Sequence, residues 1–349
     1  MAYASITKPS LHFNTKLYTG NGGTQSITGV GFQPDWVWIK RRGATNTHTL
    51  WDAVRGTTKW IESNSNNAEQ TYAGGLTAFG TDGFSIGDGG DINTNSASQV
   101  AWNWKANGAG SADTSGTINS TISANTTAGF SIVKYVGDGT GGNNTIAHGL
   151  GAVPGVVLYK NLDSARNWIV YHKGIGATKN LYLDLNNSQN TASNTFNNVA
   201  PTSTFLNVND SVGVNESGDN HVAYCFAEIK GYSKFGSYTG NANVDGPFVY
   251  TGFKPAFIIT KRYNANENWY IKDNKRSVSN PVDEALYANG NNAELTGWSG
   301  ATTDYLSNGF KVRTTDTAHN GSGDSYLYMA FAEEPLVANV GESIPATAR

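Results

Sequence analysis

The sequence has few charged residues. Asp, Glu, Lys and Arg make up 15% of it, against roughly 25% in an average soluble protein. The formal net charge is -3, with a pI near 6.1. A protein that binds nucleic acid usually has a clear basic excess. The composition therefore gives no support to nucleic-acid binding, and the abundant glycine, with 41 residues, is typical of a loop-rich β protein.

Cysteine is nearly absent. Cys225 is the single one and lies within the apolar run 222–226, where we predict a small core residue rather than a reactive thiol. A disulfide framework within the chain is excluded. One cysteine and six scattered histidines do not form a recognisable zinc-binding pattern.

Long apolar runs are also missing. No segment approaches the 18 or more continuous apolar residues of a transmembrane helix, so we expect no insertion into a membrane. The first residues, 1–8, have no apolar stretch and do not resemble a signal peptide.

One pattern occurs three times. A proline, an apolar run and a closing lysine follow at the same spacing in Pro34–Lys40, Pro154–Lys160 and Pro255–Lys261. Proline is tolerated as the first residue of a strand. The residues after it are apolar on both alternating faces, which predicts a strand buried on both sides. We call these the anchor strands.

Further segments keep register with the anchor strands. Alternating apolar runs at 100–104, 222–226 and 327–331 are predicted to be the strand that closes each repeat. Three groups of residues share equivalent positions: Trp36, Val156 and Phe257; Trp38, Leu158 and Ile259; Trp104, Phe226 and Phe331. Three repeats of about 100 residues are too long for solenoid units.

We therefore predict an all-β protein of three tandem β-sandwich, jelly-roll-like repeats. The predicted boundaries are 1–106 for repeat 1 with a short lead-in, 118–231 for repeat 2, and 232–349 for repeat 3 with a C-terminal tail from 337. Residues 107–117 are rich in Gly and Ser and are predicted to be a flexible linker.

No motif indicates catalysis. Residues 137–142 fit G-x-G-x-x-G but precede a turn and a strand, where a dinucleotide site needs a helix. The sequence has no G-x-S-x-G elbow and no H-E-x-x-H. Asp52 and Asp273 are equivalent, but repeat 2 has His172 there, which argues against a shared catalytic role. We expect no enzyme, no cofactor and no catalytic residues. The Gly/Asp-rich loop 87–91 leaves calcium binding open.

The nine tryptophans are the main candidates for contacts. Trp36, Trp38 and Trp104 have Val156, Leu158 and Phe226 as counterparts, which indicates core filling because a sugar platform needs a flat ring. Trp60 and Trp298 have no clear counterpart and are the candidate exposed contact aromatics. The basic cluster 40–42 after the first anchor strand is predicted to be a solvated strand end.

Several segments resemble a known family. They are residues 16–22, 31–41, 51–56, 75–79 with 82–84, 101–102 and 329–333. Together they are similar to an uncharacterised repeat-domain family of marine bacteriophage virion proteins, of the cyanophage and pelagiphage kind, often labelled as tail fibre. Repeat 2 departs from the pattern, with Val212 at the Phe84 position and His172 at the Asp52 position. The family has no established catalytic residues.

The resemblance implies a structural or adhesive part of a phage particle. We expect a tail fibre or tail-associated receptor-binding component that is homo-oligomeric and contacts other virion proteins and a host surface glycan or receptor. It would be located in the virion after assembly in the host cytoplasm. The alternatives are a capsid decoration protein or head fibre, and a tail-borne polysaccharide-degrading enzyme. The sequence leaves open the tail or head location and the receptor.

Overall fold

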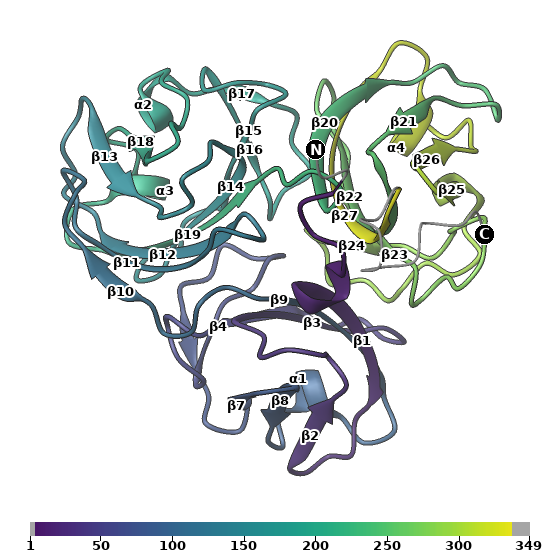
Figure 1. Ribbon diagram of the computed structural model, residues 1–349, viewed down its shortest axis with the longest axis horizontal. Helices are drawn as coiled ribbons and strands as arrows, with labels where there is room; N and C mark the ends of the chain where they lie inside the picture. The colour runs from purple at the N-terminus through teal and green to yellow at the C-terminus, as the bar shows by residue number, and fades with distance from the viewer. Residues whose placement is uncertain (1–3, 337–349) are drawn as a thin grey trace.

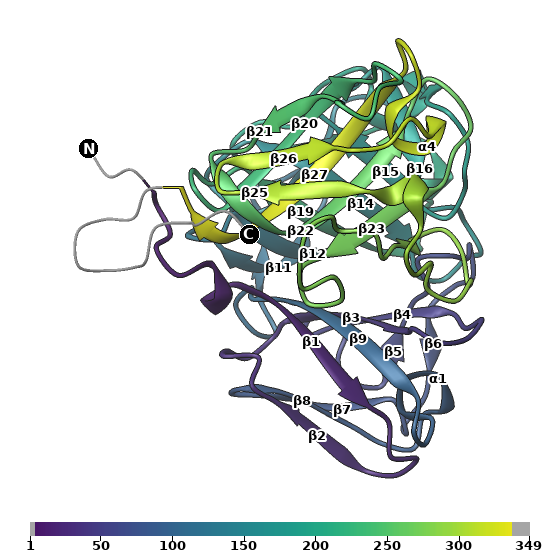
Figure 2. The ribbon, with the colours of Figure 1, turned by 90° about the vertical axis from the view of Figure 1, so that its right-hand side faces the viewer.

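A computed structural model describes residues 4–336 of the protein. The predicted C-terminal tail, 337–349, lies outside the described residues. The all-β class is confirmed: antiparallel sheets form three lobes around a common centre (Figure 1), and only short helices interrupt them. Figure 2 shows repeat 1 lying below the other two lobes when the molecule is turned by 90°.

Repeat 1 contains the first nine strands and two short helices. They are η1 (Pro9–Leu11), β1 (Phe13–Thr19), β2 (Gln25–Thr28), β3 (Trp36–Arg41), β4 (His48–Asp52), β5 (Lys59–Trp60), β6 (Gln70–Thr71), β7 (Leu76–Gly80), β8 (Gly83–Ile86), α1 (Gly90–Asn93) and β9 (Ser98–Trp104).

Repeat 2 has two extra strands at its start. Its elements are β10 (Ser111–Asp113), β11 (Ser120–Asn125), β12 (Phe130–Val136), β13 (Asn144–Ala147), β14 (Pro154–Asn161), β15 (Ile169–His172), β16 (Lys179–Tyr182), β17 (Asn190–Thr191), α2 (Ser193–Phe196), β18 (Phe205–Val208), α3 (Val212–Asn215) and β19 (Asn220–Ala227).

Repeat 3 follows the same plan. Its elements are β20 (Ser233–Thr239), β21 (Phe248–Tyr250), β22 (Phe253–Arg262), β23 (Trp269–Asp273), β24 (Leu286–Tyr287), η2 (Ser299–Ala301), β25 (Thr303–Leu306), β26 (Gly309–Val312), α4 (Thr317–Asn320) and β27 (Ser325–Pro335).

The larger sheets share one strand order. It is β1-β9-β3-β4 in repeat 1, β12-β19-β14-β15 in repeat 2 and β20-β27-β22-β23 in repeat 3. In each case the anchor strand pairs antiparallel with the closing strand, and the predicted equivalents face each other: Trp36 with Trp104, Val156 with Phe226, and Phe257 with Phe331. The predicted anchor and closing strands are confirmed, with every residue from Trp36 to Lys40 buried.

Each larger sheet has two buried faces because of the alternation along its strands. In repeat 1, Val37 and Ile39 face a smaller sheet, β2-β8-β7, and pack with Phe84. Trp36 and Trp38 point the opposite way, toward the centre of the molecule. Strand pairing identifies Leu206 as the counterpart of Phe84 in repeat 2, because Ile27 pairs with Phe84 and the equivalent Ile146 pairs with Leu206. The prediction that placed Val212 there was wrong, because Val212 begins α3.

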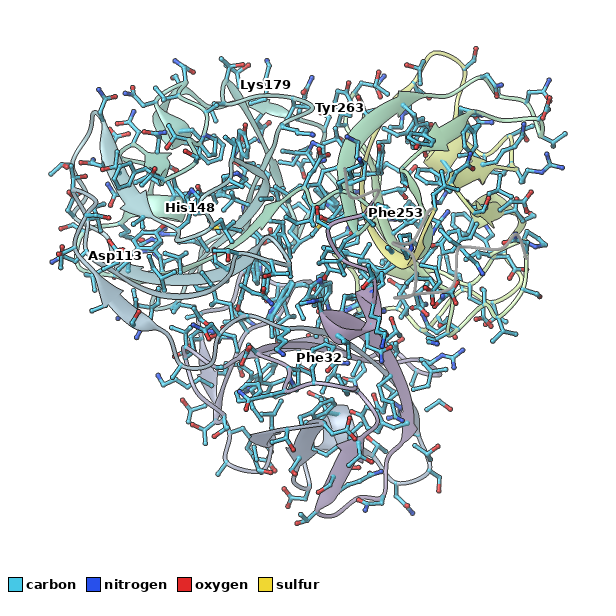
Figure 3. All side chains as sticks on the ribbon, in the orientation of Figure 1. Phe32, Asp113, His148, Lys179, Phe253 and Tyr263 are labelled. Carbon is cyan, nitrogen blue, oxygen red and sulfur yellow. The ribbon has the colours of Figure 1, made fainter. Side chains whose placement is uncertain are left out.

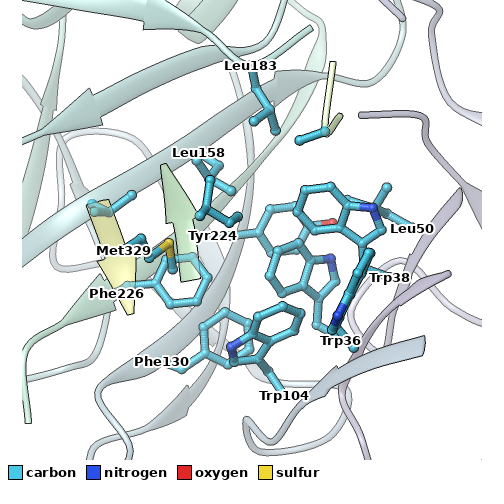
Figure 4. Close-up of a cluster of buried hydrophobic side chains, with 14 of the residues drawn as sticks. Trp36, Trp38, Leu50, Trp104, Phe130, Leu158, Leu183, Tyr224, Phe226 and Met329 are labelled. Atoms are coloured by element: carbon cyan, nitrogen blue, oxygen red, sulfur yellow. The ribbon is translucent and has the colours of Figure 1, made fainter. Parts of the chain in front are cut away.

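The three repeats meet in one aromatic cluster at the centre. Figure 4 shows Trp36, Trp104, Phe130, Tyr224 and Phe226 packed together. The ring centroids of Trp36 and Tyr224 are 4.5 Å apart, and the angle between the two ring planes is 20°. Trp104 contacts Phe226 of repeat 2 as well as repeat 3. The predicted core role of Trp36, Trp38 and Trp104 is confirmed, and all three are at most 1% exposed. Much of the core is thus shared between repeats.

The interfaces between repeats follow a cyclic pattern. In each repeat the segment that follows β5, β16 or β24 donates one backbone N–H to a carbonyl of the next repeat. The three equivalent bonds run from Glu69 to Leu162, from Gln189 to Tyr263, and from Glu294 to Arg42. Figure 3 marks Tyr263 between the upper two lobes. The three repeats are therefore related by an approximate threefold symmetry.

The closing lysines of the anchor strands are buried in these interfaces. Lys40, Lys160 and Lys261 are each at most 1% exposed. Each ammonium group has three donors, and each donates to two carbonyls of its own repeat and one of another repeat. The acceptors are Arg41, Ala44 and Asn291 for Lys40; Asn161, Arg166 and Asn66 for Lys160; and Arg262, Glu267 and Asn186 for Lys261.

The prediction of a solvated strand end at 40–42 was therefore wrong for Lys40. The reason is tertiary: the loop of a neighbouring repeat covers the end of the strand and supplies a carbonyl acceptor. Burial lowers the pKa of Lys40 and Lys160 to about 8 and that of Lys261 to about 7.

Two of the three interfaces also contain a buried ion pair. Asp52 pairs with Arg55 in repeat 1, and Asp273 pairs with Arg276 in repeat 3, with all four side chains fully buried. A neighbouring repeat donates a hydrogen bond to each aspartate. Tyr224 Oη donates to Asp52 Oδ2 at 2.7 Å, and Trp102 Nε1 donates to Asp273 Oδ2 at 3.0 Å.

The third interface replaces this arrangement. Repeat 2 has His172 where the aspartate stands and Ile175 where the arginine stands, and the donor position on repeat 3 is Met329. His172 Nε2 instead donates to the Tyr328 carbonyl oxygen at 3.2 Å, while its Nδ1 accepts from the Gly174 N–H. The Met329 side chain has no hydrogen to donate. This interface therefore lacks both the aspartate and the side chain that would donate a hydrogen bond to it.

The segment predicted as a flexible linker is partly a strand. Residues 111–113 form β10, which pairs antiparallel with β11 at the edge of the repeat 2 sheet. The Asn107 N–H donates to Ser123 Oγ at 2.8 Å. The linker is thus tied to repeat 2, and the predicted domain boundaries remain predictions.

The buried ion pair of repeat 1 leads to a stability prediction. Asp52→Leu leaves the Arg55 guanidinium buried without its main partner, and we expect this to cost about 3–5 kcal/mol of unfolding free energy. Asp52→Leu/Arg55→Met removes both charges and should cost less than the single change. Urea unfolding measures both. Asp304→Leu, in a partly exposed pair with Arg313, is the control and should change stability by about 0.5 kcal/mol at most. A double variant less stable than the single one contradicts the prediction.

The buried lysines predict a pH dependence. Burial also lowers the pKa of Lys272 to about 7, far below the roughly 10.4 of an unfolded lysine. Between about pH 7 and 8.5 the folded protein then binds fewer protons than the unfolded chain, so unfolding free energy rises with pH. Urea unfolding at pH 7.0 and 8.5 should show this rise, and Lys272→Met should show a smaller one. The partly exposed Lys234→Met should retain the full rise. A flat or falling profile in the wild type contradicts this assignment.

Candidate functional site

The candidate site is a groove at one end of repeat 1, which we call the repeat 1 groove. It has a volume of about 330 Å³. Figure 2 shows the elements that form it, β4, β5, β6 and α1, gathered at one side of the repeat. Its lining residues come from these elements and the adjoining turns, and are Thr49, Trp51, Trp60, Gln70, Thr71, Tyr72, Gly75, Gly89, Gly90, Asp91 and Ile92.

The floor of the groove follows from the alternation along β4. His48, Leu50 and Asp52 face the centre of the molecule, so Thr49 and Trp51 face the groove. Trp51 stacks on Trp60 of β5, with ring centroids 6.2 Å apart and an angle of 27° between the planes. Trp51 is buried and Trp60 is partly exposed. The floor is therefore a fixed aromatic surface with one ring accessible to solvent.

One wall is built from two tight turns that hold each other. The Gly87 N–H donates to the Gly75 carbonyl and the Gly89 N–H donates to the Gly74 carbonyl, both at 2.9 Å. A Cβ atom on Gly87 would lie 2.8 Å from the Gly74 carbonyl oxygen, so the close approach of the two turns favours glycine there. Tyr72 Oη donates to Asp88 Oδ1 at 3.0 Å. The wall is thus fixed before any ligand arrives.

Two polar atoms at the floor lack a partner. Thr49 Oγ1 and Trp51 Nε1 are buried, and neither has a hydrogen bond within the described part of the chain. Both residues are only 2% exposed. A buried polar group left unsatisfied costs about 1–3 kcal/mol. Both residues line the groove, but the two atoms lie under its surface and are closed to solvent, so a polar molecule in the groove reaches them only when the groups above them shift.

The charge in the groove is acidic. Asp91 lines it and is exposed, and its carboxylate makes no hydrogen bond among the described residues. Among those that line the groove there is no Lys, Arg or His. Nearby Lys59 is paired with Glu69 at 2.6 Å. The groove thus offers hydroxyl acceptors and donors but no cation for an anionic ligand.

The same place in repeats 2 and 3 is covered by an aromatic residue of the chain. Phe196 of α2 packs on Tyr171, which is the counterpart of Trp51, at 5.7 Å. Trp298 stacks on Tyr270, the counterpart of Thr49, at 5.4 Å. Phe196 lies in 192–204, between β17 and β18, and Trp298 lies in 296–302, before β25, whereas the corresponding part of repeat 1 is the turn 72–75 followed by β7. The shorter turn leaves the repeat 1 groove open.

The two predicted contact aromatics lie in different environments. Trp60 lines the repeat 1 groove. Trp298 lies in repeat 3, partly exposed, and packs on Tyr270 and His319. The structure does not bring the two together, and their contact roles remain predictions.

Sequence reasoning did not group the other lining residues with Trp60, among them Thr49, Trp51, Tyr72 and Asp91, although it singled out the loop 87–91 for calcium. One signal was available: the turn 72–75 before β7 is shorter than the segment 296–302 before the equivalent strand β25 of repeat 3. The unpartnered state of Thr49 and Trp51 had no sequence signal, because it depends on what packs around them.

The other loops noted in the sequence have structural roles. In the loop 137–142, the Asp138 N–H donates to the buried Asn215 side chain, and the chain continues into β13 as predicted. A Cβ on Gly137 would lie 2.2 Å from the Glu216 carbonyl oxygen, which explains this glycine. Within residues 4–336, no group of three or more His, Cys, Asp or Glu side chains could hold a metal ion.

Cys225 is fully buried, as predicted, and burial raises the pKa of its thiol to about 12. Among the helices of the described residues, none is long and apolar enough to cross a membrane.

The comparisons identify a family. A family model described as a domain of unknown function, DUF7483, matches residues 8–335. The chain belongs to this family, and the matched unit spans all three repeats. No curated protein and no solved structure matches the chain.

The wall of the groove leads to a titration prediction. The hydrogen bond to Asp88 raises the pKa of Tyr72 above its usual value of 10.0. Asp88→Asn removes the charge that opposes ionisation of the phenol, so the pKa of Tyr72 should fall toward 10. The ¹³Cζ resonance of Tyr72, assigned with Tyr72→Phe, follows the titration. Asp304→Asn, away from the groove, should leave it unchanged. An unchanged pKa in Asp88→Asn contradicts this bond.

Proposed function

We propose that this chain is a non-catalytic structural and adhesive component of a bacteriophage virion, a tail fibre or tail-associated receptor-binding protein. In this proposal its three sandwiches are copies of one jelly-roll-like unit. The resemblance to marine phage virion proteins supports the assignment. The contacts that the protein would make are with other virion proteins and with a host surface glycan or receptor.

The observation that carries the proposal is the combination of a core shared by the three repeats with the aromatic floor of the repeat 1 groove. An adhesion module needs a scaffold that does not deform and contact residues on the turns that it presents. The central aromatic cluster joins the three repeats, and the repeat 1 groove lies on the outer side of one of them. A protein that acts by binding needs no catalytic group in addition to these two features.

The carboxylates favour binding over hydrolysis. A glycosidase uses two carboxyl groups that flank the bond to be cleaved. The groove lining contains one, Asp91. Asp52 and Asp273 are committed to buried arginines at repeat interfaces. The equivalence of Asp52 and Asp273 therefore has a structural explanation, and a polysaccharide-degrading activity has no supporting pair in the groove.

The approximate threefold arrangement also suits a fibre-like part. Phage tail fibres commonly reach threefold symmetry with three chains, whereas here one chain supplies three equivalent repeats. The proposed location is the virion, after assembly in the host cytoplasm. Assembly into a homo-oligomer would add to the symmetry already present within the chain.

Labelling of intact virions tests the proposal. Gold-labelled antibody against this chain should mark the tail of the phage that encodes it, and the purified chain should be retained on host cells. Label over the head would instead make it a capsid decoration protein or head fibre. Virions that lack the chain serve as the control. Absence of label on virions, or release of reducing ends from host polysaccharide by the purified chain, contradicts the proposal.

A further inference from the structure

We propose that the repeat 1 groove is a binding site for a single neutral pyranose ring of a glycan. The inference rests on the proposed adhesive function and specifies the ligand class and the residues for it. Trp60 is the stacking surface, Thr49 and Trp51 hydrogen-bond the ring from below, and Asp91 accepts from its hydroxyl groups.

The aromatic floor fits the shape of a sugar ring. A pyranose has C–H bonds on one face and hydroxyl groups around its edge. Trp60 is partly exposed and is held in place by stacking on the buried Trp51. A flat ring that is already fixed loses little conformational entropy when a ligand stacks on it. The accessible face of Trp60 is therefore ready for the apolar face of the ligand.

The unpartnered polar atoms fit the edge of the same ring. Trp51 Nε1 can only donate, and Thr49 Oγ1 can donate and accept. Both atoms belong to residues that line the groove and have no partner among residues 4–336, and both are closed to solvent, so a ligand reaches them when the groups that cover them shift. A sugar hydroxyl can accept from one of them and donate to the other. An aliphatic or aromatic hydrocarbon ligand would leave both atoms unsatisfied.

The charge selects against anionic ligands. Asp91 is an exposed carboxylate at the groove, and its described lining contains no cationic side chain. Phosphates, uronates and sialates would meet repulsion with no compensating ion pair. A neutral hydroxyl instead donates to the carboxylate in a charge-assisted hydrogen bond. The ligand class is thus a neutral sugar.

The size selects for one ring. A volume of about 330 Å³ lies at the lower end of the roughly 300–1,000 Å³ range of small-molecule pockets. The other repeats show independently that this position accepts a ring: Phe196 packs there on Tyr171, and Trp298 stacks there on Tyr270. In repeat 1 Trp60 stacks on Trp51, and the ring of a ligand would add to this stack on the exposed side of Trp60.

The test uses the full chain and a panel of methyl pyranosides of glucose, galactose, mannose and N-acetylglucosamine. Indole ¹H–¹⁵N resonances report each tryptophan, and Trp51 and Trp60 are assigned by substitution. We expect at least one neutral pyranoside to shift the Trp51 and Trp60 signals in a saturable manner, with Trp298 unmoved. Methyl glucuronide and N-acetyltryptophanamide are the anionic and aromatic comparison probes and should bind more weakly.

Two variants have matched controls. Thr49→Val keeps the shape and removes a hydroxyl that has no partner, so the protein should stay folded while affinity falls about three- to tenfold. Thr260→Val removes another buried, unpartnered hydroxyl in repeat 3 and should leave affinity unchanged. Trp60→Ala should lower affinity at least about tenfold, and Trp298→Ala should not.

The outcomes separate this inference from the proposed function. If no neutral pyranoside moves Trp51 and Trp60, or if N-acetyltryptophanamide binds better than every sugar, the inference is overturned, and virion labelling still decides the proposed function. If sugars bind as expected but virions carry no label, the groove assignment stands and the virion assignment fails. Equal loss of affinity in Thr49→Val and Thr260→Val also overturns the inference.

Discussion

The rest of this structure depends on one constraint: the three larger sheets, which are the inner sheets of the three lobes, contact one another at one central aromatic cluster. Each inner sheet has large side chains on the face that points away from its own sandwich, and Trp36, Trp104, Phe226 and Phe331 are among them. A repeat on its own would expose this face to water, at a cost of roughly 25 cal/mol for each Å² of apolar surface. The three repeats therefore form one folding unit, which agrees with a family model that spans 8–335.

Polar contacts around this cluster fix how the repeats face one another. The three buried lysines, each donating to a carbonyl of another repeat, place the same contact at all three interfaces. The buried ion pairs occur at two interfaces, and the third has His172 and Met329 instead. Breaking the symmetry there preserves hydrogen bonding, because the acceptor and its donor changed together. Such directional contacts favour one arrangement of the three lobes over alternatives that a purely apolar interface would also allow.

Freedom to vary is greatest away from the centre. The outer turns are not tied to the shared core, and their lengths differ among the repeats. In repeat 2 and repeat 3 a turn aromatic covers the strand equivalent to β4, and in repeat 1 it does not. Repeat 1 thus has a groove at a place where the other two repeats have an aromatic side chain packed on the strand. The shared core and the repeat 1 groove are thus built from opposite faces of the same strands.

The sequence by itself determined the class of fold, the three repeats and the central strands. These were readable because strand burial leaves a local pattern: Trp36, Val156 and Phe257 each follow a proline at the same spacing. It also predicted that Trp36 and Trp104 fill the core, since aliphatic and phenylalanine counterparts mark a buried position. The recurrence of the lysine was visible too, but its burial was not, because the covering carbonyl comes from a loop of another repeat.

Only the tertiary structure decided which faces of the sandwiches meet and where a groove remains. Trp60 could be chosen from the sequence because it has no counterpart, but Thr49, Trp51 and Asp91 could not be grouped with it. The four residues are spread over β4, β5 and α1, and whether a polar atom is satisfied depends on every group packed around it. Strand pattern is a local property of the chain, whereas burial without a partner is a property of the assembled molecule, and so the sequence predicted the scaffold and the fold defined the site.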